Sequence, residues 1–377
     1  ILFLRFGFAV GSLGFMGVMA VILLGHLVTI PTAMAISEIA TNRRVEGGGE
    51  YFIISRSFGL NIGATIGIAL YLSQAISVAF YVIAFTEAFE FFFNWVTSEY
   101  DLLLPRQAIS LPAMLILTAL ILKRGANIGV KALILIVIIL GASLVLFFAG
   151  STEYAASTEN SFFNGSFRNS NSFFLVFAIV FPAFTGMTAG VGLSGDLKSP
   201  RKSIPRGTLL ATVLGMIIYI FIAWKLNASA SPEELVNEQL IMGKIALYGA
   251  WVIPLGLAAS TISSAIGSVM VAPRTLQALS NDKVFPFRGM NAFLARGKEK
   301  DNEPFNASIV TCVIAIVFVL IGDVNMVAEI ISMFFMVTYG ALCLISFLNH
   351  WGSDPSYRPT FRSRWYFSLT GFLVSFW

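Results

Sequence analysis

The stretch "FAIVFPAFTGMTAGVGLSGDLKSPRKSIPRG", residues 177–207, begins like a membrane-spanning helix and then changes to residues that disfavour one. Pro182 removes a helical donor and frees a carbonyl one turn earlier. Four glycines follow it, Gly186, Gly190, Gly192 and Gly195. Unpaired backbone is tolerated at membrane depth only where it is buried in protein or lines a cavity. The stretch therefore predicts a helix interrupted at a binding site. A structural kink stays open as the plainer alternative, because Pro and Gly are common in membrane helices.

The composition around this stretch is that of a membrane protein. Of its 377 residues, 57% are hydrophobic and 12% are charged, whereas about 25% of a soluble protein is charged. Apolar runs long enough to span about 30 Å of hydrocarbon recur along the chain. They lie near residues 1–11, 15–40, 60–93, 107–122, 128–149, 171–195, 206–225, 243–272, 305–321, 324–348 and 365–377. Because both ends fall within such runs, we expect a fragment that starts within helix 1 and ends within helix 11.

The basic residues divide unevenly between alternate connections. Of the 24 lysines and arginines, 19 fall on one side and 5 on the other, and the positive-inside rule makes the richer side cytoplasmic. The net charge of +4 therefore reflects topology and does not suggest a nucleic-acid partner. Cys312 and Cys343 lie in predicted spans, so neither a disulfide framework nor a zinc site is expected.

The order of the segments predicts an inverted repeat. Segments one to five and six to ten form two halves of opposite orientation, because five is an odd number of crossings. Each half starts with an interrupted segment, at Gly7 and Gly11 in the first and at Pro182 and Gly186 in the sixth. Such a pair is typical of secondary transporters with a site at mid-membrane. The predicted fold is therefore an all-α polytopic membrane protein with a LeuT-like inverted five-helix repeat, discontinuous first and sixth helices and one transport domain over residues 1–377.

The interrupted sixth helix could serve ions of both signs. A second half-helix starting near Gly186, Met187 and Thr188 would present free N–H groups and a positive dipole end to an anion. The first half would end near Pro182 with carbonyl oxygens suited to a dehydrated cation. Thr185, between the halves, adds a hydroxyl.

Two further sets of polar residues within the spans are candidate ligands. Ser260, Ser263 and Ser264 in "AASTISSAIGS" either offer oxygen ligands to a small cation or allow close helix packing. Tyr81 and Tyr339 lie deep in apolar spans, where packing with one satisfied hydroxyl is the ordinary role of a tyrosine.

Arg5 and Glu87 are charges within apolar runs. Such charges are costly and normally paired, which suggests a salt bridge near the outer mouth. The sequence has no Ser-His-Asp set, carboxylate dyad or metal cluster, so we expect neither an enzyme nor a cofactor. Glu38 and His26, in the second segment, are assigned no role.

Four stretches resemble the cation-chloride cotransporter family of the amino acid-polyamine-organocation superfamily. They are "IATNRRVEGGGEYFIISRSFG" (39–59), "FPAFTGMTAGVGLSGDLKSPRKSIPRGT" (181–208), "SSAIGSVMVAPRTLQALSNDKVFP" (263–286) and "IISMFFMVTYGAL" (330–342). The resemblance covers essentially the whole chain, in order.

The resemblance implies ligands for potassium and chloride. The potassium positions match the hydroxyl of Tyr81, the carbonyl of Pro182 and Thr185. One chloride position matches the N–H groups after the break, together with a tyrosine of the tenth segment; these residues are Gly186, Met187, Thr188 and Tyr339. A second chloride would rest on the unwound turn of the first helix, of which only Ile1 belongs to this chain.

The resemblance also implies a sodium site and an outer gate. The sodium positions match Ser263 and Ser264 with a carbonyl at Ser260, a pair typical of the sodium-coupled branch. The gate matches Arg5 and Glu87. The sequence departs from the family pattern at Thr188 and Ser260, where backbone ligation would survive the change of side chain.

The function implied is electroneutral cotransport of chloride with potassium and sodium by alternating access. The partners would be these small inorganic ions and the lipid bilayer of the cell membrane, crossed many times. A homodimer is left open, and the family's twelfth helix and cytoplasmic C-terminal domain are expected outside this chain. One alternative is an amino-acid permease of the same superfamily. Another is a non-transporting scaffold or regulatory homologue, which the retained Tyr, Thr and Ser positions disfavour.

Overall fold

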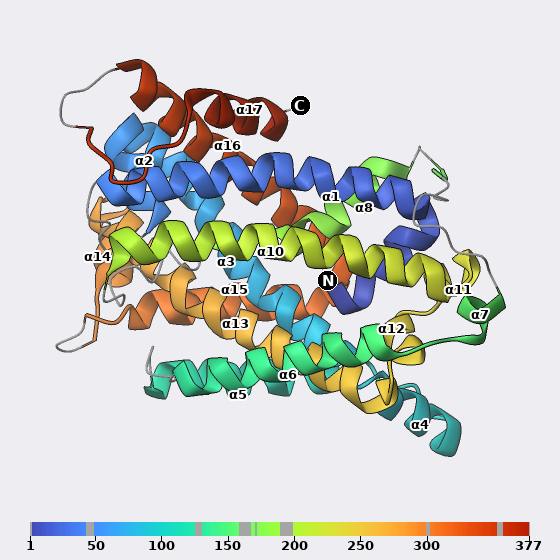
Figure 1. Cartoon of the computed structure of the whole chain (residues 1–377). Helices are drawn as coiled ribbons and strands as arrows, with labels where there is room; N and C mark the ends of the chain where they lie inside the picture. The colour runs from blue at the N-terminus through green and yellow to red at the C-terminus, as the bar shows by residue number, and fades with distance from the viewer. Residues whose placement is uncertain are drawn as a thin grey trace.

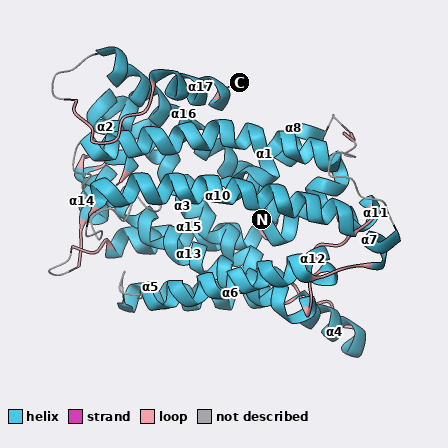
Figure 2. Cartoon of the chain, in the orientation of Figure 1, coloured by secondary structure: helices cyan, strands magenta, loops and turns pink. Residues whose placement is uncertain are grey.

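The chain folds into a bundle of helices. The computed structural model describes residues 2–42, 49–124, 130–157, 167–169, 172–188, 199–298, 302–352 and 357–376. Within these ranges there is no sheet, only an isolated bridge between Lys298 and Glu303 (Figure 2). The all-α fold class predicted from the sequence is confirmed.

Each predicted apolar segment contains helix in the part of it that the structure describes. The helices that cross or enter the bundle are α1 (Leu2–Asn42), α3 (Leu60–Glu87), α5 (Gln107–Arg124), α6 (Val130–Ala149), α8 (Phe173–Val180), η2 (Phe181–Phe184), α10 (Pro200–Ser229), α13 (Gly249–Asn281), α15 (Phe305–Ile321), α16 (Val324–Gly352) and α17 (Trp365–Ser375). Five of them, α1, α3, α10, α13 and α16, are long and apolar enough to cross a membrane by themselves. The shorter connecting helices are α2 (Glu50–Phe58), α4 (Glu90–Tyr100), α7 (Glu153–Ser157), α11 (Pro232–Asn237), α12 (Ile241–Ile245) and α14 (Arg288–Ala295).

The first two predicted segments are joined in α1, with a sharp bend between them. Gly14 has a non-helical conformation, with φ 73° and ψ 171°, which only glycine adopts readily. The predicted interruption at Gly7 and Gly11 is wrong, because the helix is continuous through both. A side chain at either position would instead collide with α11 or α12, so these glycines allow the outer connection to pack closely on α1.

The connecting helices gather at two opposite ends of the bundle (Figure 1). α2 and α14 lie at one end, and α4, α7, α11 and α12 lie at the other. The first end carries connections from the Lys- and Arg-rich set, so the fold agrees with the alternation of charge in the sequence. Between the ends, α3 packs against α13 and α16, and α1 packs against α10. Large exposed apolar side chains on α6 and α10 fit helices that face lipid.

Glu38 anchors the segment that precedes α17. Its side chain is completely buried, although its position near the end of α1 suggested an interfacial residue. Oε2 accepts hydrogen bonds from Ser363 Oγ at 2.5 Å and Ser363 N at 3.2 Å, and from Ser346 Oγ of α16 at 3.3 Å. The carboxylate therefore ties α1, α16 and the start of α17 together.

Candidate functional site

The sixth span loses its helical path after Pro182. α8 ends at Val180, and a 3₁₀ turn continues to Phe184. Thr185 is extended, with φ −88° and ψ −175°, and Gly186 has a φ of +106°. Met187 and Thr188 return to helical conformation. The predicted second half of this helix continues outside the described residues, so the pair of half-helices stays a prediction.

Side chains from two other helices bind carbonyls around Pro182. In a regular helix the Ala178 carbonyl would accept a hydrogen bond from the N–H of residue 182, but Pro182 has no N–H. Ser332 of α16 replaces this donor in part: its Oγ lies 2.6 Å from the Ala178 oxygen and 2.8 Å from the Ala328 oxygen of its own helix, so its single O–H is shared between the two carbonyls. Tyr219 of α10 donates to the Ala183 carbonyl at 2.7 Å. The interrupted backbone is thus partly satisfied from outside its own helix.

The two predicted potassium ligands of the sixth span lie together. Thr185 Oγ1 donates to the Pro182 carbonyl at 2.8 Å, and the Thr185 N–H approaches the same oxygen at 3.4 Å. One dehydrated cation could therefore contact both oxygens, as carbonyl and hydroxyl ligands do in ion-selective sites.

Three tyrosines converge on the interruption. Tyr81 of α3 lies close enough to Tyr219 and to Tyr339 of α16 for electrostatic interaction with both. The ring of Tyr339 packs 6.4 Å from that of Phe181. Tyr219 also stacks on Phe6 at 5.2 Å. Sequence reasoning missed Tyr219, although it lies deep in an apolar run, the same signal that pointed to the other two tyrosines.

The predicted chloride ligands share a buried surface. Tyr339 is fully buried, and its hydroxyl faces the backbone of Gly186 without a hydrogen bond of normal geometry. Met187 and Thr188 begin a helical turn, and the N–H groups of a first turn have no partner within it. An anion beside Tyr339 could therefore accept from both the hydroxyl and the backbone. Ile1, assigned to the second chloride, lies outside the described residues.

The predicted sodium ligands on α13 differ among themselves. Ser260 Oγ donates to the Leu257 carbonyl at 3.0 Å, as hydroxyls in membrane helices commonly do. Ser263 and Ser264 are half-buried, and their hydroxyls make no hydrogen bond with the described residues. No hydrogen bond among the described residues joins this pair to the interruption at Pro182, although the neighbouring residues Thr261 and Ala265 line a cavity together with Tyr81.

The outer charges pair differently from the prediction. Glu87 forms its ion pair with Arg106, just before α5, and Arg5 Nε donates to Asn325 Oδ1 at 2.6 Å. Gln239 lies between the two charges. Its amide nitrogen donates to Glu87 at 3.2 Å, and its amide oxygen accepts from Arg5 at 3.1 Å. The expected direct Arg5–Glu87 bridge is therefore replaced by one through Gln239. Arg106 follows α4 by only a few residues, and no local pattern identified it as a partner.

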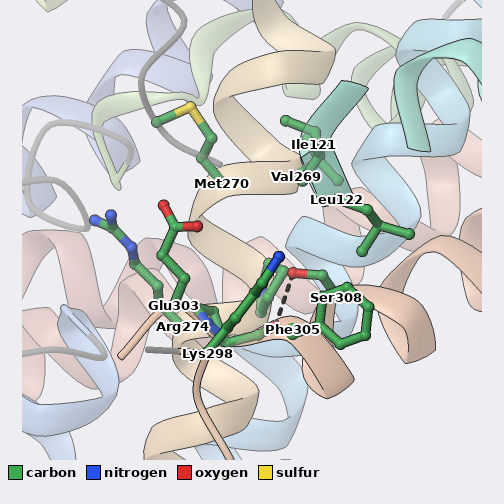
Figure 3. Close-up of a pocket in the computed structure, with 11 residues that line it drawn as sticks. Ile121, Leu122, Val269, Met270, Arg274, Lys298, Glu303, Phe305 and Ser308 are labelled. Atoms are coloured by element: carbon green, nitrogen blue, oxygen red, sulfur yellow. Dashed lines mark hydrogen bonds between the residues drawn. The ribbon is translucent and has the colours of Figure 1, made fainter. Parts of the chain in front are cut away.

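Two cavities lie among the helices of the bundle, and one of them reaches Tyr81. One of about 40 Å³ lies between α5, α13 and the start of α15 (Figure 3), with Arg274, Lys298 and Glu303 on one side and apolar residues on the other. A larger cavity of about 300 Å³ lies between α3, α5 and α13, where Tyr81 and Thr261 are the polar residues of an otherwise apolar lining. An apolar cavity cannot replace the water around an inorganic ion, so the larger cavity by itself does not supply an ion site.

Known proteins similar to this chain are transporters. The sequence model of the family described as "Amino acid permease" matches residues 1–374. The chain is 32% identical over 413 aligned positions to mouse "Solute carrier family 12 member 1", and 33% identical over 414 positions to mouse "Solute carrier family 12 member 2". Each alignment covers 96% of this chain but 37% and 34% of the relative, so the chain spans about a third of their length.

These similarities confirm the predicted family and the multi-pass membrane location. They agree with the expectation that the chain is a transporter and not an enzyme. They also agree with the whole-chain resemblance to cation-chloride cotransporters, the group that solute carrier family 12 represents. An all-helical bundle with an interrupted sixth span and a match over residues 1–374 place this chain in the amino acid permease family, within which it resembles solute carrier family 12.

Proposed function

We propose that this chain moves chloride together with potassium and sodium across the membrane by alternating access. The interruption at Pro182 carries the proposal. It brings the oxygens of Pro182 and Thr185 to 2.8 Å from each other and sets the buried Tyr339 hydroxyl against Gly186. The hydroxyls of Ser263 and Ser264, which make no hydrogen bond with the described residues, support sodium as a second cation.

A neutral combination of ions has a physical advantage. The membrane potential contributes about 2.3 kcal/mol per charge for each 100 mV, so it neither drives nor opposes a cargo without net charge. The ion gradients alone then set the direction of transport.

Ion uptake into proteoliposomes tests the proposal. We expect uptake of labelled chloride to require rubidium, as a substitute for potassium, and to rise with sodium. Tyr81→Phe and Thr185→Ala should each weaken the apparent affinity for rubidium about tenfold, since a hydrogen-bonding ligand of a charged group contributes about 1.5–3 kcal/mol.

Matched controls are available for both variants. Tyr100→Phe changes an exposed tyrosine of α4, and Thr118→Ala removes a hydroxyl that bonds the Met114 carbonyl of its own helix and contacts the Cys312 thiol, away from the interruption at Pro182. Both should transport like the wild type. Chloride uptake that ignores both cations would contradict the coupling.

Amino-acid transport is the second candidate, because the matching family is described as "Amino acid permease". The N–H groups near Gly186 could bind a substrate carboxylate in place of chloride. Uptake of amino acids that competes with chloride would favour this candidate. The packed rings of Phe181, Phe335 and Tyr339 leave little space for such a substrate, so we expect no competition.

A further inference from the structure

Glu50, the first residue of α2, is buried without a partner. Its exposed fraction is 0%, and neither carboxylate oxygen has a hydrogen-bond partner of normal geometry among the described residues, the backbone N–H of Glu50 itself being the one donor close to it. No ion pair among the described residues involves it. An ionised carboxylate in such a place is very costly, and the group takes up a proton instead. Burial raises the pKa of Glu50 to about 8, so the carboxyl is neutral in this structure at pH 7.

The ionisable groups around α2 do not neutralise Glu50. α2 packs against α1, α3, α13 and α16. At the α13 side, Asp282 accepts hydrogen bonds from Tyr51 at 2.8 Å and from Arg56 at 3.2 Å. The charges of Asp282 and Arg56 therefore compensate each other. On α3, the Tyr71 hydroxyl contacts Thr311 at 3.3 Å. These groups have partners of their own and leave the Glu50 carboxyl unpaired.

The helices on the other side supply one titratable neighbour. Glu38 of α1 is held by Ser363, whereas Tyr339 of α16 lies close enough to Glu50 for electrostatic interaction. Tyr339 is the residue that faces Gly186 in the candidate anion site. A charge on Glu50 would therefore be felt where the anion binds.

We propose that Glu50 is a proton-binding site coupled to the anion site at Tyr339, an inference that rests on the proposed function. A protonated carboxyl is uncharged and tolerates an anion beside Tyr339. An ionised carboxylate repels it, and little solvent is present to screen the repulsion. Chloride binding at Tyr339 thus requires a proton on Glu50.

The proton is released when water reaches Glu50. α2 lies at the end of the bundle predicted to be cytoplasmic (Figure 1), so opening on that side hydrates the carboxyl and lowers its pKa toward about 4.3, the ordinary value for Glu. The carboxyl O–H bond then breaks, its electron pair stays on the carboxylate oxygen, and the proton passes to water. The new charge expels chloride. Because the proton is taken from and returned to the cytoplasm, the charge carried across the membrane is unchanged.

Two measurements over pH 6–9.5 test the proposal on the purified full chain. The first is the chloride affinity, from the rise of the unfolding temperature with chloride. We expect the affinity of the wild type to fall by up to about tenfold per pH unit above pH 8, as for any ligand coupled to one proton. Glu50→Gln, which cannot ionise, should have a constant affinity. Glu99→Gln, at an exposed glutamate of α4, should follow the wild type.

The second measurement is the unfolding temperature in potassium gluconate without chloride. The folded-state pKa of Glu50 lies above its unfolded value, so its protonation stabilises the folded protein at low pH and this stabilisation is lost as pH rises through about 8. The unfolding temperature of the wild type should therefore fall relative to Glu50→Gln as pH rises. Glu50→Leu, which needs no hydrogen-bond partner, is the second variant if the buried amide prevents folding.

The outcomes separate this inference from the proposed function. Coincident pH profiles of wild type and variants would overturn the proton site, even with normal chloride and rubidium uptake. Stabilisation of the wild type by potassium, absent in Glu50→Gln and independent of pH, would also overturn it in favour of a cation site. A pH-dependent difference between wild type and Glu50→Gln, without any ion uptake, would support the proton site and contradict transport.

Discussion

Pro182 removes a hydrogen-bond donor from one helix, and Ser332 of another helix supplies a donor in its place. The proline leaves the Ala178 carbonyl without its helical donor, and the hydroxyl of Ser332 supplies one at 2.6 Å. A carbonyl without a partner is costly at membrane depth, so this hydrogen bond lowers the cost of interrupting the helix at Pro182. The interruption is therefore a property of α8 and α16 together.

Ser332→Ala should destabilise the protein by about 1–2 kcal/mol, because it leaves the Ala178 carbonyl unsatisfied in a buried position. The measurement is the unfolding free energy in mixed micelles. Thr338→Val is the matched control, since the Thr338 hydroxyl bonds only the Phe334 carbonyl of its own helix and its loss should cost less. Equal effects of the two substitutions would contradict the role given to Ser332.

The helix α2 is held against α3 at a glycine. A methyl group on Gly67 would overlap the ring of Tyr51, and it would come within 3.0 Å of Leu279. The ring cannot move aside easily, because Tyr51 is 1% exposed and its hydroxyl is bonded to Asp282 at 2.8 Å. The position of α2, and with it that of Glu50, depends on this close contact.

Gly67→Ala should therefore cost about 1–3 kcal/mol of stability, the usual range for overpacking. Gly141→Ala on α6 is its control, because nothing lies within 4 Å of the added methyl group and alanine favours the helix. Thermal unfolding of both variants checks the prediction. A Gly67→Ala protein as stable as the wild type would show that α2 is not packed in this way.

The connections that are rich in Lys and Arg lie at one end of the bundle, and the connections with few basic residues lie at the other. The end that holds α2 and α14 is the predicted cytoplasmic end, and α4 lies at the other (Figure 1). The ion pair between Glu87 and Arg106 lies toward the α4 end, whereas Glu50, which has no partner among the described residues, lies at the α2 end. The two ends of the bundle therefore carry different electrostatics.

Cysteine labelling tests this orientation. Tyr100→Cys on α4 should react with a membrane-impermeant maleimide in intact cells, and Phe287→Cys before α14 should react only after permeabilisation. Both positions are exposed, and the native Cys312 and Cys343 are buried, so background labelling should be low. The reverse pattern would invert the topology and place Glu50 on the outside.

Several features were predictable because they depend on each residue's own chemistry. Apolar runs predict spans, as lipid offers no hydrogen bonds to backbone. Pro182 predicts an interruption since it has no N–H, and the two-sided distribution of basic residues predicts orientation. None of these requires knowledge of a distant neighbour.

Partners could not be predicted in this way, because they come from positions far apart in the chain. Glu87 was expected beside Arg5, but packing brings Arg106 to it and inserts Gln239 between the expected pair. No pattern in the sequence singled out Glu50, which the packing of α2 buries completely. The order of residues is thus enough to identify a membrane transporter with a broken sixth span. Which groups meet at the break, and which carboxyl is buried without a partner among the described residues, follows from how the helices pack, since burial and pairing depend on the surroundings of a residue.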